Sequence, residues 1–294
     1  MGEPSAAIAT SGELIPHRAA VLGSPIAHSL SPALHRAAYA RLGLAGWSYE
    51  RREVDEAALP GFLAALDDSW AGFSLTMPLK RAVIPLLDEV HPTALAVRAV
   101  NTLVLRADGS RYGENTDVPG FAGALLERGV ERIGRVAVLG GGATAGSALA
   151  ALSGLTAGPI AVFVRNPAKL VEFDALVAHF GLELEPRPFT RAAEAAEFDL
   201  VVNTTPAGAA DELAPGLPGR VGTLFDVLYH PWPTPLAAAW AARGGAVLGG
   251  RDLLLHQAVR QVELMTGVEG RSAEILEAMR EALAEPPGTG EPAS

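Results

Sequence analysis

The chain contains 294 residues, of which 49% are hydrophobic and 19% are charged, a composition typical of a globular protein long enough for two domains. Acidic residues outnumber basic ones 33 to 23, for a formal net charge of −10, which argues against nucleic-acid binding because that function needs a basic face. The chain has no cysteine, which excludes disulfides, thiolate metal sites and a cysteine nucleophile and is compatible with the cytoplasm, the location we expect.

Neither a membrane span nor a metal site is expected. No hydrophobic run reaches the length of a membrane span. Residues 1–16 have no basic region before an apolar core, so we interpret them as a flexible leader and not a secretory signal. Residues 285–294 have the composition of a flexible tail. His28 and His35 have no partner at metal-ligand spacing, so we interpret them as structural or peripheral.

The first half of the chain alternates apolar runs and helical patterns. The predicted strands are 17–22, 49–54, 72–76 and 100–105, the predicted helices are 31–41 and 59–66, and a turn is predicted at 109–113. Ser31 suits the N-cap of the first helix and Pro32 its first position. This alternation predicts an α/β layer domain over residues 17–116.

The second half has a βαβ rhythm. The predicted strands are 136–139, 160–164, 199–203, 223–227 and 246–248, and the predicted helices are 118–126, a small-residue helix that ends at Leu152, 236–243, 253–266 and 272–283. This rhythm predicts a parallel, doubly wound sheet of the Rossmann type over residues 117–249. We expect residues 250–284 to return to the first domain, with the active site in the cleft between the domains.

A glycine-rich turn follows the strand at 136–139. Gly140, Gly142 and Ala145 fit the pattern G-x-G-x-x-G/A, in which glycines let the backbone approach a pyrophosphate; a plain strand–helix turn is the alternative. At the end of the next strand, Arg165 and Lys169 precede any acidic residue, which favours NADP over NAD. The alternative is that both are solvated surface charges.

Polar residues at strand ends suggest a site for a small carboxylate. Lys80 follows a strand end near Thr76, and Asp117 could supply its carboxylate partner. Ser29 and Ser31 lie in a Pro-bounded loop, where two hydroxyls could donate to one carboxylate. Each residue also has an ordinary structural interpretation: capping for the serines and Asp117, and surface exposure for Lys80.

In combination, the motifs are more specific. In chain order they are GSPIAHSLSPALH (23–35), GFSLTMPLK (72–80), AVNTLV (99–104), GENTDVPG (113–120), GGGATA (140–145), NTTPAG (203–208), DVLYHPWPTPL (226–236) and GRDLLLHQA (250–258). Their order resembles that of the shikimate dehydrogenases over nearly the whole chain, from about residue 17 to about residue 270. The resemblance implies an NADP(H)-dependent oxidoreductase that reduces 3-dehydroshikimate to shikimate and acts on a small molecule as a monomer or homodimer.

The resemblance also implies roles for individual residues. Lys80 and Asp117 match the catalytic pair. The implied substrate ligands are Ser29, Ser31, Thr76, Asn101, Tyr229 and Gln257. The implied cofactor ligands are Gly140, Gly141, Gly142, Ala143, Thr144, Arg165, Asn166, Lys169, Thr204, Val227 and Gly250.

Some positions depart from the family pattern. Ser74 replaces an asparagine, Val118 replaces a glycine after the catalytic aspartate, and Asn166 follows Arg165 where a threonine is usual. Two alternatives therefore stay open. One is an NAD-linked quinate/shikimate dehydrogenase, against which Arg165 and Ser29 argue. The other is a catalytically silent nucleotide-binding regulator, which would be expected to lose the charged pair.

Overall fold

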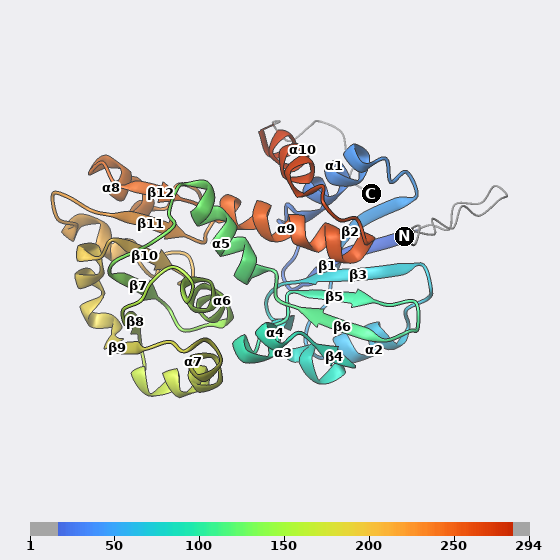
Figure 1. The fold of residues 1–294 in the computed structure, drawn as a ribbon, viewed down its shortest axis with the longest axis horizontal. Coiled ribbons are helices and arrows are strands. Elements are labelled where there is room, and N and C mark those ends of the chain that lie inside the picture. The colour runs from blue at the N-terminus through green and yellow to red at the C-terminus, as the bar shows by residue number, and fades with distance from the viewer. Residues whose placement is uncertain (1–16, 285–294) are drawn as a thin grey trace, which may run out of the picture.

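The computed structural model describes residues 17–284, which form two six-stranded sheets joined by two helices (Figure 1). The expected leader and tail lie outside the described residues. Within residues 17–284, no helix is both long and apolar enough to cross a membrane.

The first sheet is mixed and has the strand order β2-β1-β3-β5-β6-β4. Its strands are β1 (His17–Gly23), β2 (Trp47–Glu53), β3 (Trp70–Leu75), β4 (Glu89–Val90), β5 (Thr102–Leu105) and β6 (Arg111–Glu114). Its helices are α1 (Ser31–Leu42), α2 (Leu59–Ala64), α3 (Leu79–Ala82) and α4 (Pro92–Val97), and a 3-10 turn spans Ile84–Leu86. β1 pairs in parallel with β2 and β3, whereas β5 pairs antiparallel with β3 and β6.

Two local predictions in this half are wrong. Residues 111–113 lie in strand β6, because Arg111 and Glu114 pair with Leu105 and Thr102 of β5; the turn itself comes earlier, at Gly109, whose φ is +83°. Ser31 is the first helical residue of α1 and not its N-cap, which is Leu30. The hydroxyl of Ser29 instead accepts a hydrogen bond from the Ser31 backbone N–H at 3.3 Å.

The second sheet is parallel throughout, as predicted, with the strand order β12-β11-β10-β7-β8-β9. Its strands are β7 (Val136–Leu139), β8 (Ile160–Val164), β9 (Leu184–Pro188), β10 (Leu200–Asn203), β11 (Thr223–Asp226) and β12 (Ala246–Leu248). Its helices are α6 (Ala143–Leu152), α7 (Asp174–Phe180) and α8 (Pro235–Ala242), and 3-10 segments span Pro167–Phe173, Phe189–Glu197 and Asp211–Gly216. The strand order reverses at β7, where such sheets bind ligands beyond the carboxyl ends of the strands.

Helices α5 (Asp117–Glu127) and α9 (Gly250–Thr266) lie between the two sheets and pack against each other (Figure 1). A Cβ atom at Gly120 would lie 2.9 Å from the Cβ of Gln257, so the helices approach closely because this residue is glycine. Leu253 joins the core around the parallel sheet, whereas Leu255 and Val262 join a core of the mixed sheet. Helix α10 (Ser272–Ala284) packs on α1.

Candidate active site

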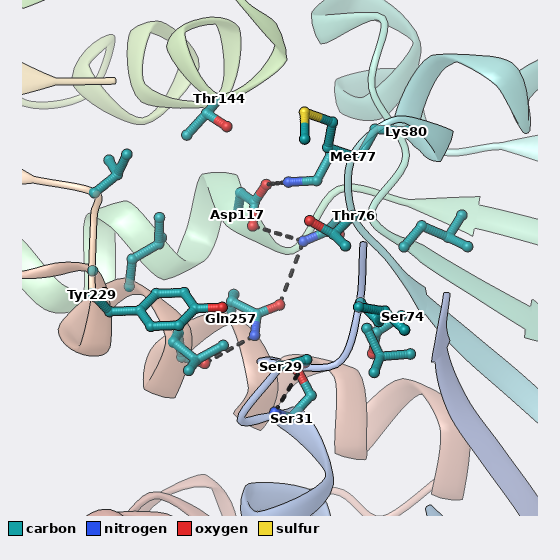
Figure 2. Close-up of a pocket in the computed structure, with 18 of the residues that line it drawn as sticks. Ser29, Ser31, Ser74, Thr76, Met77, Lys80, Asp117, Thr144, Tyr229 and Gln257 are labelled. Atoms are coloured by element: carbon teal, nitrogen blue, oxygen red, sulfur yellow. Dashed lines mark hydrogen bonds and ion pairs between the residues drawn. The ribbon is translucent and has the colours of Figure 1, made fainter. Parts of the chain in front are cut away.

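A cavity of about 260 Å³ lies at the junction of the two sheets, and both halves of the chain line it (Figure 2). The first half contributes Val21, Pro25, Ile26, His28, Ser29, Ser31, Ser74, Leu75, Thr76, Met77, Lys80 and Asn101. The rest of the chain contributes Asp117, Thr144, Val227, Tyr229, Gly250, Leu253, Leu254, Gln257 and Gln261. The structure thus brings all eight residues proposed for catalysis and substrate binding to one cavity.

Lys80 and Asp117 form an ion pair at this cavity (Figure 2). Lys80 Nζ lies 2.6 Å from Asp117 Oδ2, and the two side chains are 17% and 7% exposed. Asp117 is the first residue of α5, whose N-cap is Thr116, so its carboxylate does not cap the helix. The pair therefore places an ammonium group on the cavity wall, where it can stabilise negative charge that develops on a substrate oxygen.

Asn101 fixes the orientation of the Asp117 carboxylate. The Asn101 side-chain oxygen accepts hydrogen bonds from the Thr116 backbone N–H at 2.7 Å and from the Thr102 hydroxyl at 2.9 Å. Its amide nitrogen must therefore face the other way, and it donates to Asp117 Oδ1 at 2.8 Å. Because Asn101 and Lys80 each bind one carboxylate oxygen, Asp117 accepts one hydrogen bond on each side.

The remaining polar residues surround this pair. Ser29 and Ser31 are buried on the wall formed by the start of α1. Tyr229 comes from the loop after β11, and burial raises its pKa, so its hydroxyl stays protonated and can donate a hydrogen bond. Gln257 donates to the Leu254 carbonyl at 2.9 Å, which leaves one of its N–H groups for a ligand.

The glycine-rich turn lies at the carboxyl end of β7. Gly140 has a φ of +110°, and a Cβ atom there would lie 2.5 Å from Thr204 Oγ1. A Cβ atom at Gly141 would lie 3.0 Å from a Val164 methyl group. Helix α6 starts at Ala143, and within residues 17–284 no side chain caps its N-terminus. These free backbone N–H groups and this close turn fit a pyrophosphate.

Other predicted cofactor residues lie around this turn. Arg165, Asn166 and Lys169 are exposed after β8, an arrangement that suits both phosphate binding and solvated surface charges. The Asn166 side-chain oxygen accepts a hydrogen bond from the Ala168 backbone N–H at 3.1 Å. The Thr204 hydroxyl donates to the Leu139 carbonyl at 2.8 Å, so Thr204 stabilises the end of β7 where the glycine-rich turn begins.

Gly250 allows the loop after β11 to reach the cavity. A Cβ atom at Gly250 would lie 2.2 Å from the Val227 carbonyl oxygen. Because both residues line the cavity, a glycine at this helix start keeps the Val227 main chain at its wall. Thr144, at the start of α6, lines the same cavity and joins it to the glycine-rich turn.

Ser74 and Gln261 are among the cavity residues that have no role in the predicted site. In the sequence, Ser74 is only a departure from the family pattern, and no motif includes Gln261. Gln261 follows Gln257 by four residues on α9, the spacing that places two side chains on one helix face. This spacing was the available signal. His35 lies outside the cavity lining and is fully buried, as its structural interpretation predicted, whereas His28 reaches the cavity. The described residues contain no cluster of three or more potential metal ligands.

Comparisons with known proteins show which sequences this chain resembles. Residues 21–103 match the model of the shikimate dehydrogenase substrate binding domain. The chain is 38% identical over 270 residues to a shikimate dehydrogenase (NADP(+)) of Thermus thermophilus, covering 90% of this chain and 98% of the relative.

The chain is also similar to solved structures of shikimate dehydrogenases. The Mycobacterium tuberculosis shikimate dehydrogenase has a TM-score of 0.81 at 40% identity, covering 90% of this chain and 100% of that one. A Thermus thermophilus shikimate 5-dehydrogenase in complex with NADP(H) and shikimate has a TM-score of 0.76 at 36% identity, covering 90% and 99%.

Proposed function

The chain belongs to the shikimate dehydrogenase family, and on this premise we propose that it catalyses the reversible NADPH-dependent reduction of 3-dehydroshikimate to shikimate. The observation that carries the proposal is the Lys80–Asp117 ion pair of 2.6 Å on the wall of a cavity that Thr144 joins to the glycine-rich turn. The proposal assigns the residues 17–116 to substrate binding, 117–249 to NADP(H) binding, and 250–284 to the helices that connect back to the first half.

In the proposed mechanism, Ser29 and Ser31 bind the substrate carboxylate, and Thr76, Tyr229 and Gln257 bind the ring. NADP(H), when bound, supplies or accepts the hydride at C3. Gly140 to Thr144 would hold its pyrophosphate, and Arg165 with Lys169 its 2′-phosphate. The residues Asn166, Thr204, Val227 and Gly250 complete the proposed cofactor site.

Lys80 has the central chemical role in this proposal. Its ammonium group faces the carbonyl oxygen, stabilises the negative charge that develops there, and donates the proton that forms the hydroxyl. Asp117 keeps Lys80 in place through their ion pair, and Asn101 keeps Asp117 in place. This fixed arrangement avoids reorganisation during the reaction, which is why preorganised charges are effective.

A spectroscopic assay tests the proposal. Purified protein is mixed with shikimate and either NADP⁺ or NAD⁺, and the reduced-nicotinamide absorbance band is followed; quinate then replaces shikimate. Turnover of shikimate with NADP⁺ well above either alternative would support the proposal. NAD⁺ preference with quinate turnover would instead identify the catabolic quinate/shikimate dehydrogenase, and nucleotide binding without turnover would identify a silent regulator.

The cofactor assignment has its own control. The variant Arg165→Gln removes the charge proposed to bind the 2′-phosphate, and the exposed Arg191→Gln, on another segment, serves as the matched control. We expect the KM for NADP⁺ to rise about tenfold or more only in the first variant, since charge-assisted bonds to phosphate are strong. The KM for shikimate should not change.

We also propose that the protein is cytoplasmic and that it is a monomer or a homodimer.

A further inference from the structure

Ser74 lines the cavity, and its hydroxyl belongs to a buried hydrogen-bond network. Ser74 Oγ donates to Gln261 Oε1 at 2.7 Å, and the Tyr49 hydroxyl donates to Ser74 Oγ at 2.6 Å. The three residues come from β3, α9 and β2, and all three are buried. Ser74 and Gln261 line the cavity, whereas Tyr49 lies behind them.

The direction of every hydrogen in this network follows from the partners of Gln261. Its amide nitrogen donates to the Asn101 carbonyl at 3.3 Å and to Thr102 Oγ1 at 3.2 Å, so its oxygen faces Ser74 and His35. An amide oxygen carries no hydrogen and can only accept. The Ser74 hydrogen therefore points to Gln261, and the hydrogen of the Tyr49 hydroxyl points to Ser74.

His35 supports the same arrangement from the other side. Its Nε2 lies 3.3 Å from Gln261 Oε1 and must carry a hydrogen, whereas its Nδ1 has no partner in the described part of the chain. Burial lowers the pKa of His35 to about 3, and burial raises the pKa of Tyr49 far above its ordinary value. Both groups are therefore neutral near pH 7, and the rings stack with centroids 3.9 Å apart. The network consequently keeps one arrangement of hydrogens.

We propose that Gln261 is a positioning residue that holds Ser74 as a hydrogen-bond acceptor toward the cavity, so that this wall selects a substrate ring hydroxyl. The hydrogen of Ser74 and one of its lone pairs are engaged, so one lone pair remains for a ligand. A ligand hydroxyl can donate to that lone pair, whereas a fluorine or an ether oxygen of similar size cannot. The inference rests on the proposed function, and it concerns a ring hydroxyl other than the one that is oxidised.

The test compares shikimate with its 4-deoxy-4-fluoro and 5-deoxy-5-fluoro analogues in the wild-type protein, Gln261→Met and Tyr49→Phe. Methionine is similar in length to glutamine but has no amide, so Ser74 is free to turn its hydrogen into the cavity. Phenylalanine removes one bond from the same network but leaves the Ser74 hydrogen on Gln261. Tyr49→Phe is therefore the matched control, and thermal melts show whether both variants fold.

We expect the wild-type protein and Tyr49→Phe to have a KM about tenfold higher for one fluoro analogue than for shikimate, because the wall is left with an unmade hydrogen bond. In Gln261→Met, the ratio of the KM for this analogue to the KM for shikimate should fall to about threefold or less, because the KM for shikimate rises. The KM for NADP⁺ should not change. Equal ratios in all three proteins, or an equal loss in both variants, would overturn the inference. Failure of the wild-type protein to oxidise shikimate would instead refute the proposed function, and this inference with it.

Discussion

The variant Asp117→Asn tests the core of the proposed mechanism because both neighbours of this carboxylate are donors. Asn101 Nδ2 donates to one oxygen at 2.8 Å and Lys80 Nζ to the other at 2.6 Å. Asn101 cannot reverse its amide, since Thr102 and Thr116 donate to its oxygen. An asparagine at position 117 has one acceptor and one donor group, so a donor must face either Lys80 or Asn101.

The expected magnitude follows from this mismatch. Losing one charge-assisted hydrogen bond costs about 1.5–3 kcal/mol, and a buried donor left without a partner costs about 1–3 kcal/mol more. Because Lys80 loses its anchor, we expect kcat to fall about 100-fold to 1,000-fold, the range typical for loss of a preorganised electrostatic group. The affinity for NADPH should not change, since the glycine-rich turn is a separate part of the structure.

The assay measures kcat, both KM values and NADPH binding for Asp117→Asn and for Asp67→Asn. Asp67 is an exposed carboxylate that accepts a hydrogen bond from Ser69, and its variant controls for the loss of one negative charge. If Asp117→Asn kept kcat within about threefold of the wild-type value, the orientation of Lys80 by Asp117 would not contribute to catalysis. An equal loss of NADPH binding would indicate a folding defect instead.

Three further predictions concern catalysis, packing and pH. Lys80→Ala should lower kcat severely while NADPH binding, measured by fluorescence, stays nearly intact; equal loss of both would contradict the catalytic assignment. Gly120→Ala should lower the free energy of unfolding by about 1–3 kcal/mol because the new methyl group meets Gln257, whereas Gly61→Ala, which faces open space, should not destabilise the protein. His35 has a pKa of about 3 when folded and 6.5 in its reference state, so unfolding takes up a proton and stability is lost as pH falls below 6.5. In urea titrations, the loss of unfolding free energy between pH 8 and pH 5 should therefore be about 2 kcal/mol smaller in His35→Phe than in the wild-type protein. Equal losses in the two proteins would refute this prediction.

Local sequence patterns were sufficient for much of the fold. Short apolar runs separated by helical patterns predict the parallel sheet. The spacing of the glycines predicts the turn at Gly140, because a close approach of the backbone to a ligand requires glycine at those positions. Strand β9 was not predicted because Leu184–Pro188 contains two prolines. Proline is tolerated here because β9 is an edge strand of the sheet. Helix α7 lay outside the predicted elements too.

The candidate site could be predicted only where a motif carried its residues. Lys80 and Asp117 are 37 positions apart, and their pairing was inferred from the combined motifs and not from either residue alone. Their geometry depends on Asn101, whose amide direction is set by Thr102 and Thr116 on either side of the β5–β6 hairpin. Only the folded hairpin brings those two donors to one oxygen.

The role of Gln261 depends even more on tertiary structure. It lies 187 positions from Ser74 and 226 from His35, and its amide meets both residues only because α9 returns to the mixed sheet. A serine in place of an amide-bearing side chain looks, in sequence, like the simple loss of a hydrogen-bonding group. In the structure the buried amide is supplied by Gln261 from another element, which engages the hydrogen of Ser74 and leaves an acceptor at the cavity. The serine at position 74 therefore changes which ligand groups the wall can bind only in combination with Gln261, which lies far away in the chain.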